Sequence, residues 1–133
     1  MNCVIILDKI YDTKKETSLK ITHESNLQME PDNVCNMTNL ENLTIANSNL
    51  NTLSNDINKL GNLKKLSING NNMTKIPLSI FSLIYLEALD IRNNDIEEIP
   101  TEIQHMRSLK MLNLSCNKIE VMPKEIYNLY CIQ

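Results

Sequence analysis

The chain has 133 residues and a formal net charge of −3, and 42% of its residues are hydrophobic although only 4% are aromatic. This length allows a single domain, whose core must be built from Leu, Ile and Met. The mild charge argues against a nucleic-acid partner or a membrane-surface role.

The N-terminal segment 1–15 matches none of the patterns that follow it. Its short apolar run, Val4–Leu7, precedes the charged pair Asp8 and Lys9. The run is too short for the core of a signal peptide or for a membrane span. We expect segment 1–15 to cap the first layer of a domain that spans residues 16–133, with the apolar run as a strand.

A 23-residue period covers most of the remaining chain. Four evenly spaced leucines open the same apolar pattern: Leu40, Leu63, Leu86 and Leu109. A degenerate unit, one residue longer, comes first, so about five repeats start near residues 16, 40, 63, 86 and 109. Self-similarity at such a period is typical of a solenoid, in which each unit buries its apolar face against its neighbours.

Each repeat predicts a strand, a turn and a short helix. In the repeat that starts at Leu86, Leu89 and Ile91 alternate with polar residues, as in a strand that sends every second side chain inward. Asn94 ends the strand, and its side chain can bond nearby backbone groups in the turn. Pro100 suits the first turn of a short helix or 3-10 segment.

Equivalent residues recur in the other repeats. The turn position, which we call the asparagine ladder, holds Ser48, Asn71 and Asn117 besides Asn94. The helix position holds Ser54, Pro77 and Pro123. Apolar repeat positions hold four methionines that we expect in the core: Met37, Met73, Met106 and Met122. Met111 lies between core leucines and is expected to be partly exposed.

The pattern LxxLxLxxNxLxx(L/I)PxxIxxL, which runs through residues 40–131, resembles the leucine-rich repeat family. Its 23-residue length and Ile-Pro-x-x-Ile element are similar to the intracellular class of Scribble- and Erbin-type scaffolds and plant Ras-group proteins. The resemblance implies an α/β leucine-rich repeat solenoid, with parallel strands on the concave face and short helices or 3-10 segments on the convex face. It also implies a non-catalytic scaffold or signalling module that binds another protein.

Cysteine spacing and glycosylation patterns favour an intracellular location. The four cysteines form no CxxC pair and are predicted to be free thiols in a reducing compartment. Asn42 and Asn113 begin glycosylation patterns inside predicted strands, where a glycan would obstruct packing or the binding face. We therefore expect a cytoplasmic protein without membrane insertion.

Catalytic chemistry is not expected. His23 and Cys116 occupy the same outward repeat position, but they are four strands apart, roughly 19 Å at ~4.8 Å per strand. A nucleophile and its base need hydrogen-bond reach. The sequence has no zinc-ligand spacing and no Gly-rich phosphate loop. We predict no catalytic residue, no metal and no cofactor.

The concave strand face is the predicted binding surface. The residues assigned to partner contact are Thr44, Lys65, Ser67, Asn69, Glu87, Asp90, Arg92, Lys110 and Asn113. Ala46 is expected on the same face. Its centre is small and polar and its charges are mixed but slightly basic, which favours a mixed or mildly acidic protein partner. The alternating charges are also explained as cross-strand pairs that stabilise the sheet by about 0.2–1 kcal/mol each.

Other interpretations remain open. Interface hot spots favour aromatic residues, and Tyr127 and Tyr130 lie with Ile132 toward the convex and C-terminal surface. The segment is alternatively a targeting or regulatory part of a larger signalling protein or enzyme. The C-terminal repeat has no polar cap, so either a tail folds back over it, two copies form a homodimer there, or the array continues.

Overall fold

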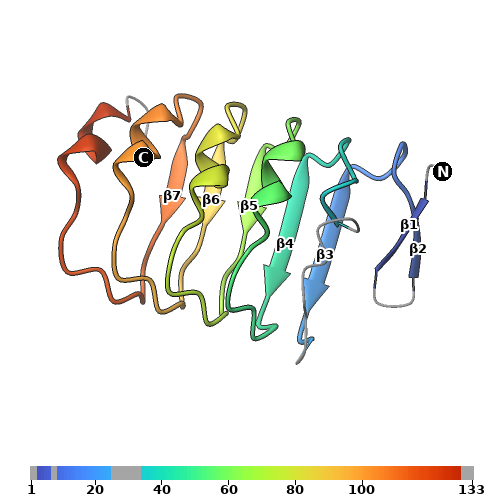
Figure 1. The fold of residues 1–133 in the computed structure, drawn as a ribbon, viewed down its shortest axis with the longest axis horizontal. Coiled ribbons are helices and arrows are strands. Elements are labelled where there is room, and N and C mark those ends of the chain that lie inside the picture. The colour runs from blue at the N-terminus through green and yellow to red at the C-terminus, as the bar shows by residue number, and fades with distance from the viewer. Residues whose placement is uncertain (1–2, 7–8, 25–33, 130–133) are drawn as a thin grey trace.

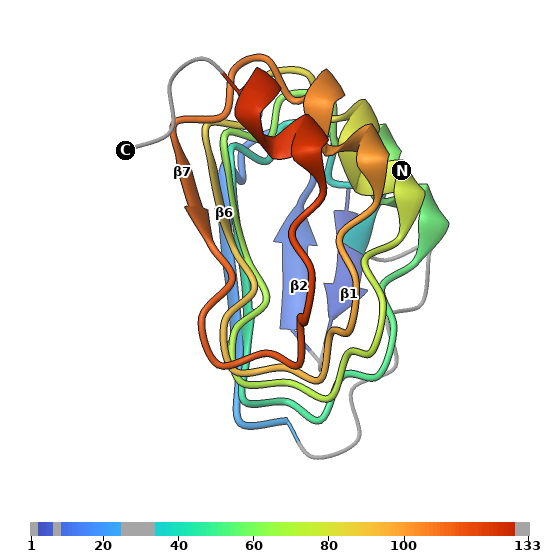
Figure 2. The ribbon, with the colours of Figure 1, turned by 90° about the vertical axis from the view of Figure 1, so that its left-hand side faces the viewer.

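The computed structural model describes residues 3–6, 9–24 and 34–129. Its main feature is a parallel five-stranded sheet in the order β3-β4-β5-β6-β7 (Figure 1). The strands are Ser18–Thr22 (β3), Asn42–Ala46 (β4), Lys65–Ser67 (β5), Ala88–Asp90 (β6) and Met111–Asn113 (β7). A 3-10 helix follows each of the last four: Asn55–Lys59 (η1), Leu78–Ser82 (η2), Thr101–His105 (η3) and Lys124–Asn128 (η4). The end view shows the strands along one side of the coil and the helices away from them, so the predicted solenoid is confirmed (Figure 2).

The core leucines of successive strands lie side by side. Parallel pairing in register aligns Leu19, Leu43, Leu66, Leu89 and Leu112 across the five strands. Each repeat therefore stacks on the next in the same register, as the solenoid requires, and the degenerate first repeat follows the same register. Because side chains alternate along a strand, the residues that flank each of these leucines point to the opposite, outer side of the sheet.

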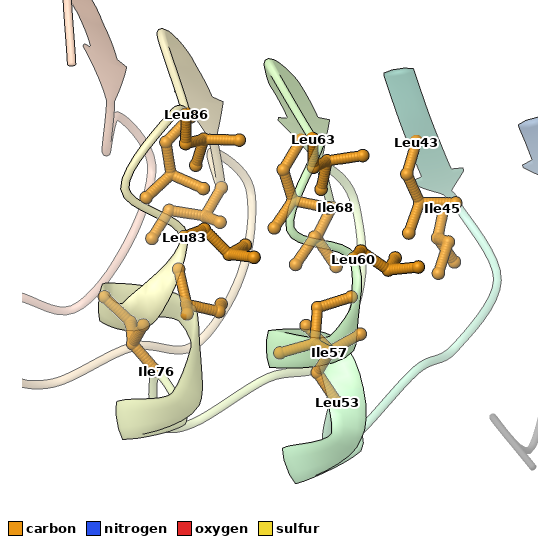
Figure 3. Packing of buried hydrophobic residues seen from close by; sticks show 14 of the residues in the cluster. Leu43, Ile45, Leu53, Ile57, Leu60, Leu63, Ile68, Ile76, Leu83 and Leu86 are labelled. Carbon is orange, nitrogen blue, oxygen red and sulfur yellow. The ribbon is translucent and has the colours of Figure 1, made fainter. Parts of the chain in front are cut away.

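Leu and Ile side chains from strands, loops and helices form one continuous core. Figure 3 shows Leu43 and Ile45 of β4 beside Leu60, which ends the same repeat, and Leu63, which opens the next one. Ile57, from η1, is fully buried with them. Burying a side chain of this size contributes about 1.5–3 kcal/mol. Each repeat supplies only a thin layer, so its stability depends on its neighbours.

Proline stands directly before three of the helices. Pro77, Pro100 and Pro123 have φ of −66°, −60° and −68° with ψ between 136° and 145°, so they are extended N-cap residues. The missing N–H of proline costs nothing at a helix start, where backbone donors have no intrahelical partner. Ser54 takes this place before η1, and its hydroxyl accepts a hydrogen bond from the Asp56 N–H at 3.1 Å. The prolines thus lie at the N-cap, next to the predicted first turn.

The asparagine ladder bridges neighbouring repeats. Asn71 Nδ2 donates to the carbonyl of Ile45 in the preceding repeat at 2.8 Å and to that of Ile68 in its own repeat at 3.1 Å. Its Oδ1 accepts from the Ser48 N–H at 3.0 Å. Asn94 makes the equivalent bond back to the Ile68 carbonyl at 2.8 Å. The predicted turn-forming residues are therefore also polar links between one repeat and the next.

The residue before each ladder position adopts a left-handed backbone. The φ angles are 52° for Asn47, 65° for Gly70, 54° for Asn93 and 56° for Cys116, and His23 at the equivalent place after β3 has a φ of 62°. Glycine adopts this region freely, and Asn and His are enriched in it among other residues. Each strand therefore ends in the same sharp turn, and Cys116 is the residue least suited to it.

The N-terminal segment forms a hairpin in place of the single predicted strand. β1 (Cys3–Ile6) pairs antiparallel with β2 (Lys9–Asp12). The hairpin lies beyond β3 in Figure 1, and Figure 2 projects it onto the interior of the coil. Tyr11 packs against the core. We expect the hairpin to cap the stack, and the domain division after residue 15 stays a prediction; Leu7 lies outside the described residues.

The last repeat is covered on one side only within the described chain. Leu112, Leu114 and Ile126 are partly buried, and Met122 is 52% exposed. The methionines of the earlier repeats, Met37, Met73 and Met106, are buried as predicted. The core prediction for Met122 is wrong, because burial at this position needs a following repeat to pack against it.

Candidate functional site: the concave face

The nine predicted contact residues lie on the outer side of the sheet or directly beside it. Five belong to the strands: Thr44, Lys65, Ser67, Asp90 and Asn113. Two directly precede β6 and β7, namely Glu87 and Lys110, and two follow β5 and β6, namely Asn69 and Arg92. The strand residues alternate with the core leucines and are all at least partly exposed.

Part of this face is a shallow groove with a volume of about 310 Å³. Four predicted residues line it: Thr44, Lys65, Ser67 and Asp90. The other lining residues include Asn42, Ala88 and Met111. Met111 is 47% exposed, as expected for its place between core leucines. The short side chains at the centre of the groove allow another chain to approach the strands closely.

Two ion pairs lie at the edge where the strands begin. Lys110 Nζ donates to Glu87 Oε2 at 2.9 Å, and Lys64 Nζ lies 3.1 Å from Glu41 Oε2. The hydrogen bond from Lys110, together with its charge, holds the pKa of Glu87 below its ordinary value. These alternating charges are cross-strand pairs. Glu87 and Lys110 are therefore already engaged with each other.

Asp90 supports the turn that follows β6. Its Oδ1 accepts from the Arg92 N–H at 3.2 Å, and its Oδ2 lies 3.5 Å from Arg92 Nε. The Asp90 side chain is only 16% exposed, whereas that of Arg92 is 48% exposed. Asn113 has the same role one repeat later, because its Oδ1 accepts from the Ser115 N–H at 3.1 Å. Arg92 is therefore the accessible member of the pair.

The structure changes the predicted concave face at two positions, Lys20 and Ala46. Lys20 of β3 pairs in register with Thr44 and is exposed. Sequence reasoning missed it, although Leu19 and Ile21 flank it in the same pattern that surrounds Thr44. Ala46 is only 6% exposed, so its predicted place on the accessible face is wrong.

The described residues contain no group of three or more His, Cys, Asp and Glu side chains placed to hold a metal ion. His23 and Cys116 follow β3 and β7, the outermost strands of the sheet. Cys35 is buried, and burial raises the pKa of its thiol to about 11, with the charge of Asp56 adding to the effect. A thiol with this pKa stays protonated at neutral pH and is a poor nucleophile.

A second candidate surface, with several apolar side chains, lies at the open side of the last repeat. A groove of about 760 Å³ is lined there by residues that include Leu112, Ile119, Met122, Ile126 and Tyr127. Tyr127 is 86% exposed, as the alternative C-terminal surface requires. The other two predicted anchors, Tyr130 and Ile132, lie outside the described residues. Within the described segments, no helix has the length and apolar character that crossing a bilayer demands.

Comparison with known proteins supports a leucine-rich repeat family. The family model for the leucine-rich repeat matches residues 61–119, which contain β5, β6 and β7. A leucine-rich repeat protein of Leptospira interrogans superposes with a TM-score of 0.77 at 28% identity, over 87% of this chain and 29% of that one. An internalin (inlF) of Listeria monocytogenes superposes with a TM-score of 0.77 at 23% identity, over 87% of this chain and 32% of that one. Internalin C2 (inlC2) of the same species superposes with a TM-score of 0.65 at 24% identity, over 72% of this chain and 41% of that one.

These three likenesses establish the fold of the chain. The two internalins are less than 25% identical to it, so they support no conclusion beyond the fold. The chain spans less than half the length of each of these solved structures. The search of curated proteins found no match. Repeat solenoids of this kind generally serve in protein interaction rather than catalysis.

Proposed function

We propose that this leucine-rich repeat solenoid is a non-catalytic module that binds another protein on its concave face. The observation that carries the proposal is the groove where Thr44, Lys65, Ser67 and Asp90 come together from three neighbouring strands. Its lining combines these polar side chains with the apolar Ala88 and Met111, and its floor is a sheet packed on a continuous core. Repeat proteins use extended concave surfaces of this kind for recognition.

Rigidity of the face favours binding. Asn69 Nδ2 donates to Ser67 Oγ at 2.8 Å, and Asp90 and Asn113 are tied to the following backbone. Side chains that are already ordered lose less conformational entropy when a partner arrives. Arg92 is the candidate hot spot, because arginine is enriched at such positions and its side chain is accessible.

The proposal includes a cytoplasmic location. It also includes a scaffold or signalling role, as expected for the intracellular class of leucine-rich repeat proteins with 23-residue repeats. Cys35 and Cys116 are free thiols, which fits a reducing compartment. Asn42 and Asn113 lie in β4 and β7, where a glycan would cover the proposed face. The chain covers less than half of each solved neighbour, so a role as the targeting or regulatory segment of a larger signalling protein or enzyme is the alternative within the same proposal.

A second contact surface is favoured by the open side of the last repeat. The exposed Met122 and Tyr127 line an apolar groove there, and a second copy of the chain would cover it. A homodimer through this end predicts a mass that rises with concentration in sedimentation equilibrium. A monomer mass across the whole concentration range would exclude the homodimer.

Affinity capture with matched variants tests the concave face. The concave variant carries Asp90→Asn and Arg92→Gln; asparagine keeps an acceptor for the Arg92 N–H. The convex control carries Glu102→Gln and Arg107→Gln, which removes one charge of each sign beside η3. Proteins captured from extracts of the native host by the wild type should be lost with the concave variant and kept with the control. The opposite pattern would place recognition on the convex surface.

A further inference from the structure

The N-terminal half of the concave face, formed by β3, β4 and β5, carries two exposed lysines. They are Lys20 and Lys65. Neither makes an ion pair with another described residue, whereas Lys64, Lys110 and Arg92 are all paired with carboxylates. The outward positions of these three strands hold no Asp or Glu. We call the two lysines, with Asn42, Thr44 and Ser67 between them, the lysine patch.

The register places both lysines against the same central strand. Lys20 pairs with Thr44, and Lys65 pairs with Asn42, so β4 lies between them. Two strand spacings across the sheet and two residues along it separate their Cα atoms by about 12 Å. The long, flexible stems of the two lysines allow both ammonium groups to approach one acidic side chain held above β4.

Neutral donors complete the patch. Asn42, Thr44 and Ser67 are partly exposed between the lysines. Ser67 Oγ already accepts a hydrogen bond from Asn69, so its hydroxyl hydrogen is left to donate outward. The patch therefore offers charged and neutral donors to an acceptor with negative charge, and it presents no carboxylate that would repel one.

We infer that the lysine patch binds an acidic, extended segment of the partner protein, whose carboxylates lie above β4. The inference rests on the proposed function and names the chemistry of the partner. The opposite half of the face differs, since Asp90 is paired with Arg92 there, and the groove that begins at the patch continues past Ala88 and Met111. The acidic part of the bound segment thus lies over β3 to β5, and a less charged part lies over β6 and β7.

A nucleic acid fits this patch less well than a peptide does. Nucleic-acid binding gains most of its affinity from many phosphate contacts, and the two lysines of the patch supply few. Single strands are usually held by aromatic side chains that stack on the bases, and the outward positions of β3 to β7 have none. The net charge of −3 also repels a long polyanion.

Fluorescence anisotropy with short labelled peptides tests the inference. The probe alternates Ser and Glu, so that an extended chain presents its carboxylates on one side, and matched Ser-Gln and Ser-Lys peptides are controls. The wild type should bind the Ser-Glu peptide best, and more weakly as salt increases. The variant Lys20→Glu with Lys65→Glu should bind it about 10-fold more weakly and should now prefer the Ser-Lys peptide.

The control variant carries Lys75→Glu and Lys124→Glu, two exposed lysines outside the strands. It changes the net charge equally and should keep the preference for the Ser-Glu peptide. Thermal unfolding confirms that each variant is folded, and Lys20→Gln with Lys65→Gln replaces the reversal variant if that one unfolds.

Three results would overturn the inference: no binding of the Ser-Glu peptide, equal losses in both variants, or tighter binding of an oligothymidine through the same lysines. The capture experiment with Asp90→Asn and Arg92→Gln does not depend on acidic peptides. If it succeeds while the peptides fail, the concave face binds a partner that is not acidic. If both fail, the proposed function fails as well.

Discussion

Replacing Asn94 with Ala removes a polar bridge between the repeats that start at residues 63 and 86. Asn94 is 7% exposed. Its Oδ1 accepts from the Met73 N–H at 3.1 Å, and its Nδ2 donates to the carbonyls of Ile68 at 2.8 Å and Ile91 at 3.1 Å. The substitution therefore tests whether the asparagine ladder holds the stack together.

The size of the loss follows from what stays bonded. The Ile68 carbonyl still accepts from Asn71, and the Ile91 carbonyl still accepts from Asn117. The Met73 N–H, in contrast, loses its side-chain acceptor in a buried place. An unsatisfied buried donor costs about 1–3 kcal/mol, and a lost hydrogen bond about 0.5–1.5 kcal/mol. The free energy of unfolding should therefore fall by about 2–4 kcal/mol.

Urea denaturation followed by circular dichroism measures this loss, with the free energy extrapolated to water. The matched control is Asn72→Ala, because Asn72 is exposed and its side chain makes no hydrogen bond to the described residues. The control should change stability by less than about 0.5 kcal/mol. If Asn94→Ala costs no more than Asn72→Ala, the bridge does not stabilise the stack.

Two further predictions follow from backbone geometry and from charge. Gly70→Ala should lower the free energy of unfolding by about 1–3 kcal/mol, because Gly70 has a φ of 65° and an added Cβ would collide with Asn47 Oδ1. Gly61 has open space around it, so Gly61→Ala is the control, and equal losses in urea denaturation would contradict the steric argument. The Glu87–Lys110 pair lowers the pKa of Glu87 in the folded chain, so its contribution to stability is present above the ordinary pKa of a glutamate and is lost as pH falls through the lowered value. Lys110→Gln should raise the pKa of Glu87 toward 4.5 in an NMR titration of its carboxyl group, and an unchanged pKa would show that another group causes the shift.

The fold was predictable because the repeat period constrains the register. A strand residue recurs every 23 positions, so stacked coils must place Leu43, Leu66, Leu89 and Leu112 in one row. The starts of the short helices were also predictable, because a proline followed by an apolar i, i+3 pair is typical of the beginning of a helix. These features depend on local sequence and on repetition, which a single sequence contains.

Features that depend on neighbouring repeats were harder to predict. The sequence placed asparagine in the turn, but its bonds to the preceding repeat, such as Asn71 to the Ile45 carbonyl, appear only when the coils are stacked. Met122 occupies a core position of the pattern, yet it is exposed because no described repeat follows it. Lys20 was missed because the degenerate first repeat weakens the pattern that identifies its outward position.

The sequence predicted which face of the sheet carries the candidate site, but it did not predict which of the charged side chains on that face are paired. Alternation with the core leucines identified the outward residues, whose binding role stays a prediction. Which charges are accessible depends on side-chain pairing, and only the structure shows that Glu87 and Asp90 are paired while Lys65 makes no ion pair with another described residue.

Methyl NMR offers the most direct test of the stacked register on which both the core and the concave face depend. With leucine methyl groups labelled and assigned, nuclear Overhauser contacts should link Leu43 to Leu66, Leu66 to Leu89 and Leu89 to Leu112 in an unbroken row. Contacts that pair these residues with leucines at other repeat positions, or a missing link between β5 and β6, would contradict the account.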